Sequence, residues 1–313
     1  MKEPFLFFIA FCFSLNCLAQ NISSSDVSLL KNKQDSLKMD ADIMLNDTLI
    51  VNRYVADSMF TKTLVRALKT HNSFFFPFDS LASISRLYAP DSSFRIITWQ
   101  LELSKDITLK HGAIQMRTAD GSLKLFPLFD MSKSIKDQAD TITDNKNWIG
   151  AMYYNLIEKK INNKNYYVLF GYDEMDTKSD RKIVDILTFN EKNQPVFGSQ
   201  NFSYGKSLVK SPMTRYIMQY KKYAAPKLNY DPATDMIIVE HLVSESGEPE
   251  RKWTLIPDGD YEGFQWINDK WVHVDKVFHN DVITPEGQAP VPVPLDKQPL
   301  PTTNTGAAPA PQN

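Results

Sequence analysis

The sequence predicts a mainly β protein: an antiparallel meander, sandwich- or barrel-like, with an N-terminal helix packed on it. From Phe94 onward, short runs of β-branched and aromatic residues alternate with turn signals, for example at residues 119–121 and 162–165. Because a parallel crossover needs about a dozen residues or more, connections this short predict hairpins. The adjacent rings of Tyr153 and Tyr154 must point to opposite faces of a regular strand, which favours a two-sided structure over one open sheet.

Residues 1–19 have the pattern of a secretory signal peptide. Lys2 precedes an apolar run over residues 5–18, and small residues lead to a predicted cleavage after Ala19. The run is too short for a typical membrane span. We therefore expect export to the periplasm, the outer membrane or the outside, with no transmembrane segment after signal removal. An uncleaved anchor and lipid attachment at Cys17 are the alternatives.

Composition excludes several classes of protein. The only two cysteines, Cys12 and Cys17, lie in the expected signal, so the mature chain has no disulfide and no thiol chemistry. A chain of this length can bury a core without such cross-links. The net charge is −2 with acids and bases interspersed, which argues against a nucleic-acid partner.

Residues 20–46 are rich in Ser, Asp, Asn and Lys, and we expect a solvated polar leader or a loose helix. Residues 48–70 predict the clearest helix, with Asp47 or Thr48 as its N-cap. Its apolar positions recur every four residues and indicate core packing rather than a partner site: Ala56, Phe60, Leu64 and Leu68, flanked by Met59 and Ala67.

We predict one domain over residues 47–283. Its strands cover residues 94–103, 112–117, 123–128, 149–157, 166–170, 183–189, 215–220, 236–243, 253–256, 263–266 and 271–274. Residues 284–313 are Pro, Ala, Gln and Thr with almost no large side chains, which is typical of a disordered Pro-rich tail.

Several segments resemble a family of exported Bacteroidota proteins that has no assigned activity. The resemblance is carried by residues 78–81, 94–99, 112–115, 127–128, 167–171, 182–189, 195–198 and 257–263. It covers roughly residues 74–274 and implies export and a shared fold, without catalytic residues. Five Asp-Ser/Thr-apolar triplets, which begin at Asp35, Asp47, Asp57, Asp79 and Asp140, resemble the O-glycosylation signal of such proteins. Ordinary capping and turn roles are the alternative for these triplets.

The acidic segment 173–180 is the sharpest candidate site. Asp173, Asp176 and Asp180 offer oxygen ligands for Ca²⁺, although their spacing is not that of an EF-hand. The alternative is a solvated loop whose acids are neutralised by neighbouring bases, Lys178, Arg181 and Lys182. A second acidic turn holds Asp258, Asp260 and Glu262, with the same two interpretations.

Familiar catalytic patterns are missing from the sequence. The five histidines are scattered without His-Glu-x-x-His spacing, and no Gly-x-Ser-x-Gly occurs. Gly205-Lys206-Ser207 lacks the earlier glycine of a phosphate loop. Many Trp and Tyr residues lie on predicted strands, where they either fill the core or stack on sugars or a partner.

The sequence assigns no activity. We expect a non-enzymatic binding or structural module of the cell envelope, with an envelope protein or a glycan as partner. A polymer hydrolase that uses a carboxylate pair and a calcium-stabilised binding module are the alternatives.

Overall fold

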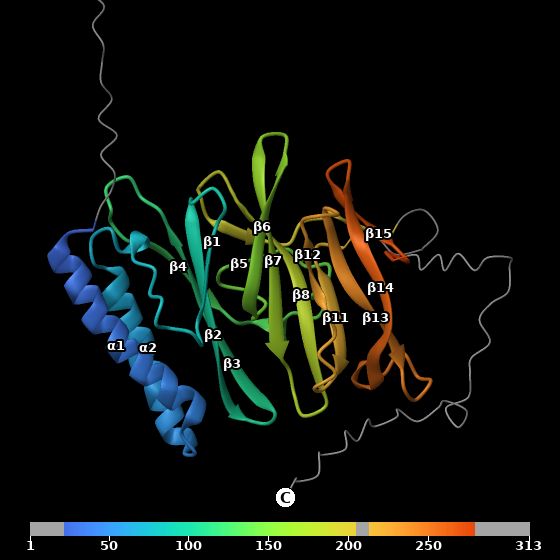
Figure 1. Cartoon of the computed structure of the whole chain (residues 1–313), viewed down its shortest axis with the longest axis horizontal. Helices are drawn as coiled ribbons and strands as arrows, with labels where there is room; N and C mark the ends of the chain where they lie inside the picture. Colours follow the sequence, from blue (N-terminus) through green and yellow to red (C-terminus); the bar gives the residue numbers. More distant parts are fainter. Residues whose placement is uncertain (1–21, 205–212, 279–313) are drawn as a thin grey trace, which may run out of the picture. The chain divides into compact units, whose positions relative to one another are not determined.

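The computed structural model describes residues 22–204 and 213–278. The expected signal (1–19), the Gly205-Lys206-Ser207 segment and the expected Pro-rich tail (284–313) lie outside the described residues. Within the unit Met1–Val277, helices and strands form successive layers (Figure 1). The predicted fold class, mainly β and antiparallel with N-terminal helices, is confirmed.

The first layer is a hairpin of two helices, α1 (Ser24–Asn46) and α2 (Ile50–Leu68). The Ser23 side chain begins α1 by accepting from the backbone N–H of Asp26. Of the two expectations for residues 20–46, the helix is found and the solvated leader is not, because α1 buries one stripe in the core: Leu30, Gln34, Leu37, Ala41 and Met44. Intervals of four and three residues place these on one helix face. Because most residues of α1 are polar, its overall composition does not reveal this stripe.

Helix α2 confirms the helix predicted over residues 48–70, but the predicted N-cap at Asp47 or Thr48 is wrong. The N-cap residue is Leu49, and no side chain caps this helix. Ala56, Phe60, Leu64 and Leu68 are buried, whereas Met59, expected to flank that stripe, is 46% exposed. The buried carboxylate of Asp57, the first residue of one Asp-Ser/Thr triplet, ties α2 to the first sheet. Its Oδ1 accepts from Trp99 Nε1 at 2.9 Å.

The first sheet follows the chain in the order β1-β2-β3-β4, all antiparallel. The strands are β1 (Ser85–Tyr88), β2 (Phe94–Ser104), β3 (Ile107–Met116) and β4 (Lys124–Phe129), after the short 3-10 turn η1 (Ser73–Phe75). β2 is buried on both faces. Ile97 and Trp99 pack against the helices, while Phe94 and Ile96 pack against the central sheet.

The central sheet has the order β5-β9-β8-β7-β6, and β11 also pairs with β8. Its strands are β5 (Thr143–Asp144), β6 (Met152–Ile161), β7 (Lys164–Glu174), β8 (Ser179–Phe189), β9 (Pro195–Phe197) and β11 (Tyr216–Lys221), preceded by η2 (Ser132–Ser134). Along β7, Tyr167 and Leu169 enter one hydrophobic cluster and Val168 and Phe170 enter another. The alternation confirms a sheet covered on both faces.

The third sheet has the order β10-β15-β14-β13-β12. Its strands are β10 (Phe202–Ser203), β12 (Leu228–Asp231), β13 (Met236–Ser244), β14 (Leu255–Ile267) and β15 (Lys270–Val274), with η3 (Lys252–Thr254) before β14. β10 pairs parallel to β15, and the other named strands in the described ranges pair antiparallel.

The strands predicted at residues 253–256 and 263–266 are one strand, β14. Asp258, Gly259 and Asp260 bulge from it opposite His241, where the register with β13 shifts, and Gly259 has a φ of +94°. The bulge keeps both halves of β14 on the same partner. The predicted acidic turn is therefore a bulge within a strand.

In the part of the chain that the structure describes, no helix has the length and apolar character needed to cross a membrane.

Candidate functional site

A groove lies where edge strands of the three sheets come together. One hollow of about 530 Å³ is lined by β1 residues, including Arg86, and by Tyr154, Tyr172 and Lys182 of the central sheet. A second hollow of about 380 Å³ shares Tyr154 and Lys182 and continues along β12 to Tyr230 and Tyr261. We call these six residues and the two hollows they line the tyrosine groove.

A β-bulge places the central ring of this groove. The register of β6 against β7 shifts between Tyr153 and Asn155, which leaves Tyr154 without a partner in the ladder. Tyr153 is buried in the core, while Tyr154 is 38% exposed. The Tyr154 hydroxyl donates to the backbone oxygen of Leu228 at 2.6 Å and joins the central sheet to the edge strand β12.

The hydroxyl groups of three groove tyrosines are engaged in the protein. Besides Tyr154, the Tyr230 hydroxyl donates to Asp235 at 2.8 Å, and the Tyr172 hydroxyl bonds Asp180. Burial and the neighbouring Asp235 carboxylate raise the pKa of Tyr230 to about 12. Burial, with Asp180 nearby, also raises the pKa of Tyr172. The rings are thus held in fixed orientations, with Lys182 over the ring of Tyr154 and Lys159 over the ring of Tyr230.

Positive charge prevails along the groove. Lys182 Nζ donates to the backbone oxygen of Pro226 at 2.7 Å and lies 5.6 Å from the ring centre of Tyr154. Burial lowers the pKa of Lys182, and the charge of Glu240 partly opposes this. Arg86 and Lys227 add two further cations to the lining, against one carboxylate, Asp231.

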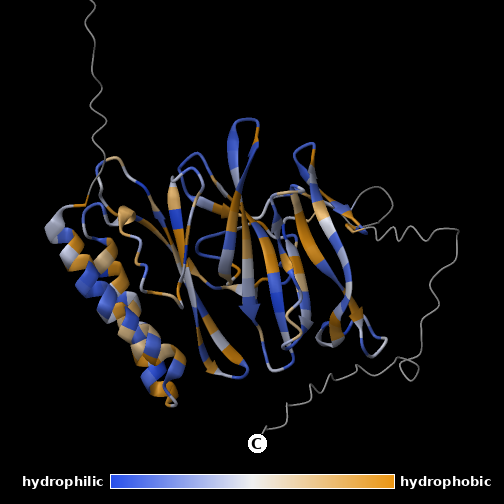
Figure 2. Ribbon diagram, viewed as in Figure 1, coloured by the Kyte–Doolittle hydropathy of each residue, from blue (hydrophilic) through white to orange (hydrophobic). Residues whose placement is uncertain are grey.

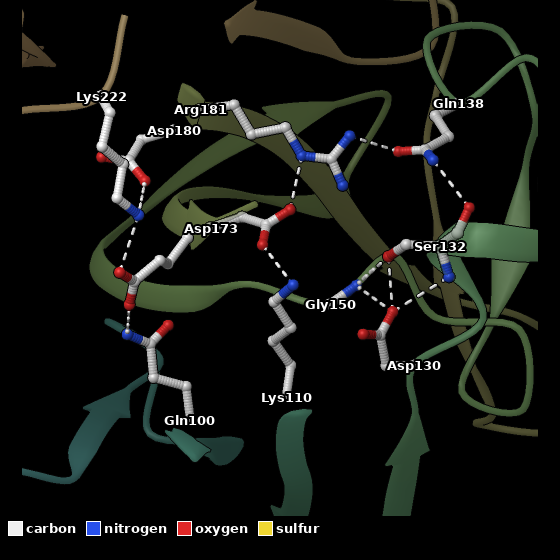
Figure 3. A network of polar contacts seen from close by, with 11 residues as sticks. Gln100, Lys110, Asp130, Ser132, Gln138, Gly150, Asp173, Asp180, Arg181 and Lys222 are labelled. Carbon is white, nitrogen blue, oxygen red and sulfur yellow. Dashed lines mark hydrogen bonds and ion pairs between the residues drawn. The ribbon is translucent and has the colours of Figure 1, made fainter. Parts of the chain in front are cut away.

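A network of buried ion pairs lies next to the groove (Figure 3). Asp173 on β7 is 1% exposed and lies between two cations, Lys110 Nζ of β3 at 2.5 Å and Arg181 Nε of β8 at 2.5 Å. Arg181 also donates to Gln138 Oε1 at 2.6 Å. Asp173 therefore links the first sheet to the central sheet through charge.

The second half of the network is centred on Lys222. Its Nζ contacts carboxylate oxygens of Asp180 and Glu174, each at 2.8 Å, and Gln100 of β2 donates to Glu174 at 3.2 Å. Burial lowers the pKa of Lys222, but hydrogen bonds to Asp180 and Glu174 outweigh it, so the net pKa is raised. Because Tyr172 also bonds Asp180, this ion-pair network supports one ring of the groove.

Hydrogen bonds from the Gln138 side chain and from two backbone N–H groups complete the polar region beside Arg181. Gln138 donates to the backbone oxygen of Ser132 at 2.7 Å. Asp130 Oδ1 accepts from the backbone N–H of Ser132 at 3.0 Å and from that of Gly150 at 3.1 Å (Figure 3). A Cβ at position 150 would lie 2.6 Å from the Asp130 carboxylate carbon, so any residue larger than glycine would displace that side chain from its hydrogen bonds.

Half of the predicted acidic loop is strand. β7 ends at Glu174 and β8 begins at Ser179, so Asp173 and Asp180 belong to strands and are buried; the solvated-loop expectation is wrong for them. Of the three bases expected to neutralise these acids, only Arg181 does so, by pairing with Asp173. The other cations are Lys110, which pairs with Asp173, and Lys222, which pairs with Asp180. Asp176 lies in the turn and accepts from the backbone N–H groups of Lys178 and Ser179.

The structure gives the calcium prediction no ligand set. Within residues 22–204 and 213–278, no group of three or more His, Cys, Asp or Glu side chains is arranged to hold a metal ion. Asp173 and Asp180 already face cations. In the second acidic segment, Asp258 pairs with His241 at 2.8 Å and Glu262 with His273 at 3.0 Å.

Sequence reasoning missed Lys110, Gln138 and Lys222 as members of the network. The hairpin register alone could have paired Asp173 with Arg181, which are directly opposite in β7 and β8. Lys110 and Gln138 lie far away in the chain, and no local pattern marks them. The tyrosine groove was missed as well, although the paired rings at 153–154 indicated that one of them faces outward.

The buried acids of the central sheet are paired with cations. Asp185, which is 1% exposed, lies 3.2 Å from Arg215 Nε, and burial raises the pKa of Asp185. Asp173, Asp180 and Asp185 do not line the two hollows described above. These buried acids therefore contribute to the packing of the sheets and not to the lining of the groove.

Comparison with known proteins adds no relative: no family model, no curated protein and no solved structure matches this chain. The function proposed next therefore depends on the geometry of the chain itself.

Proposed function

We propose that this chain is an exported, non-enzymatic binding module of the cell envelope and that the tyrosine groove binds an extended, acidic glycan. The observation that carries the proposal is a continuous lining of four tyrosines, three of which have hydroxyls engaged within the protein. Rings held in place by the protein lose little entropy on binding, so they contribute more of their contact energy to affinity.

The lining favours a sugar polymer over a compact ligand. The two hollows adjoin at Tyr154 and Lys182, so a ligand that fills both must be extended. Aromatic faces offer apolar area next to polar groups, which suits the apolar faces and hydroxyl rims of sugar rings. The excess of Arg86, Lys182 and Lys227 over Asp231 favours carboxylate- or phosphate-bearing units.

Two features of the sequence support the cellular part of the proposal. Residues 1–19 have the pattern of a secretory signal, and residues 74–274 resemble an exported Bacteroidota family. The balanced net charge of −2 provides no basic stripe for nucleic acid. For the hydrolase and calcium-module hypotheses, the described residues provide no comparable site: neither a carboxylate pair nor a calcium ligand set lines the groove.

Calorimetry on residues 20–313 tests the proposal with oligogalacturonate as the acidic probe and a neutral dextran oligomer of equal length as comparison. We expect the acidic probe to bind more tightly. Tyr154→Ala removes the central ring and should weaken binding about tenfold, equivalent to about 1.4 kcal/mol. Tyr154→Phe keeps the ring face and should bind nearly as the natural protein does.

Tyr223→Ala is the matched control, because Tyr223 is 86% exposed and does not line the two hollows. Absence of binding to both probes would contradict the proposal. So would a Tyr154→Ala protein that is folded by circular dichroism and binds as tightly as the Tyr223→Ala control.

A further inference from the structure

Lys182 lies where the two hollows of the tyrosine groove meet. Residues 179–182 at the start of β8 are polar, and the strand becomes hydrophobic from Ile183 onward (Figure 2). Of the residues that line the two hollows, Lys182 and Tyr154 are the two that line both. Lys182 is directly opposite Tyr172 in the register of β7 and β8, so both side chains lie on the same face of the sheet. A ligand that fills both hollows therefore passes next to the Lys182 ammonium.

The Lys182 side chain is half-buried, and no carboxylate among the described residues forms an ion pair with it. Its Nζ donates to the backbone oxygen of Pro226 at 2.7 Å and lies over the ring of Tyr154. An ammonium has three N–H groups, so this bond leaves donors for a ligand. Three other half-buried lysines each pair with a carboxylate: Lys110, Lys159 and Lys222. Lys182 lacks such a pair, although burial removes part of the water that would otherwise solvate its charge.

The other two cations of the groove lining are either engaged or solvated. The Arg86 guanidinium donates through Nη1 to the backbone oxygens of Leu81 and Ile84, so some of its donors are used within the protein. Lys227 is exposed, and water and salt weaken the attraction of an exposed charge. Lys182 is therefore the groove cation whose surroundings most favour an anionic partner.

We propose that Lys182 is the specificity-determining residue of the tyrosine groove and that its ammonium pairs with one carboxylate or phosphate of the glycan. This role rests on the proposed function, since it names the group that selects an acidic ligand at the same site. Pairing gives the remaining N–H groups charge-assisted hydrogen bonds and holds the acidic sugar unit next to the Tyr154 ring. A neutral sugar offers no charge to this ammonium, so Lys182 discriminates between acidic and neutral polymers.

Deprotonation of Lys182 provides a readout that a purely structural role would not affect. Burial lowers the pKa of Lys182, and the charge of Glu240 partly opposes this. Burial raises the pKa of Tyr154 and of Tyr172 above the usual 10, so both stay neutral where Lys182 begins to lose its proton. On β8 and around it, the nearby charged or titratable side chains are Arg86, Tyr154, Tyr172, Asp180, Lys227 and Glu240. Affinity for an acidic ligand should therefore fall as rising pH removes the charge of Lys182.

Calorimetry on residues 20–313 with oligogalacturonate and neutral dextran tests this role, and circular dichroism checks that each variant is folded. Lys182→Gln should weaken binding of oligogalacturonate about tenfold and leave that of dextran unchanged, whereas loss of a structural residue would weaken both. Lys182→Arg keeps the charge and should keep the preference for the acidic probe. Lys192→Gln is the matched control, because Lys192 is exposed and does not line the two hollows. It removes the same charge elsewhere and should bind both probes as the natural protein does.

A pH series completes the test. From about pH 7 to about pH 9.5, the affinity of the natural protein for oligogalacturonate should fall, while that of Lys182→Arg should stay constant because a guanidinium keeps its proton. A Lys182→Gln protein that retains the preference for the acidic probe would overturn the proposal, as would equal pH profiles for the natural and Lys182→Arg proteins. In both cases the natural protein still binds the acidic probe, so the proposed function stands. Absence of binding to both probes would overturn the proposed function and the role of Lys182 together.

Discussion

Asp173→Asn is the substitution that most directly tests the buried ion-pair network. It keeps the size of the side chain but removes the charge that lies between Lys110 and Arg181. The side chains of both cations are less than 10% exposed, at 9% and 7%, so water cannot replace the lost carboxylate. Breaking a buried ion pair by removing one partner costs about 3–5 kcal/mol of unfolding free energy.

Urea denaturation followed by circular dichroism measures this loss. We expect the unfolding free energy of Asp173→Asn to fall by about 3 kcal/mol, a thermal shift of roughly 6–12 °C for a domain of this size. The matched control is Glu245→Gln, which breaks a pair with Lys221 whose side chains are 41% and 45% exposed. An exposed pair of this kind contributes only about 0.2–1 kcal/mol.

A second substitution tests whether the loss of stability comes from unpaired buried cations or from lost packing. Adding Lys110→Met to Asp173→Asn removes one of the two unpaired cations and should restore part of the lost stability. The explanation by buried charge is refuted if Asp173→Asn costs no more than Glu245→Gln. It also fails if the double variant is less stable than Asp173→Asn alone.

Two further predictions concern pH and a glycine. Burial raises the pKa of Tyr154 and of Tyr216 above the usual 10, so above pH 10 the unfolded chain loses protons that the folded chain retains, and stability falls as pH rises. Thermal transitions on both sides of pH 10 should show the fall, and Tyr154→Phe should reduce it. Gly150→Ala forces a Cβ to 2.6 Å from Asp130 and should cost about 1–3 kcal/mol in urea denaturation. A Gly150→Ala protein whose unfolding free energy equals that of the natural protein would contradict the steric argument.

The two helices illustrate how far sequence patterns reach. α2 could be predicted because Ala56, Phe60, Leu64 and Leu68 form a dense apolar stripe, and all four are buried. α1 spreads its buried positions so thinly among Lys, Asp and Ser that its composition resembles a solvated segment. Its helix is stabilised by packing on α2, and that contact is not visible in a local window.

For the strands, too, some features could be predicted from the sequence and others could not. Short connections between apolar runs predicted antiparallel hairpins, which the structure confirms. The bulge that merges two predicted strands into β14 could not be predicted, because it depends on the pairing with β13 across His241. Turn-like residues such as Gly259 occur in bulges as well as in turns.

The sequence by itself predicted the long strands and the antiparallel pairing of neighbours, because apolar runs and short turns act over a few residues. It did not predict the short strands β1, β5, β10 and β12. Only the tertiary structure decided that three sheets stack behind a helical hairpin. It alone brought Lys110 to Asp173, and the edges of three sheets to one groove around Tyr154. Contacts of this kind join residues far apart in the chain, where the energy of packing and of buried charge depends on distances in space.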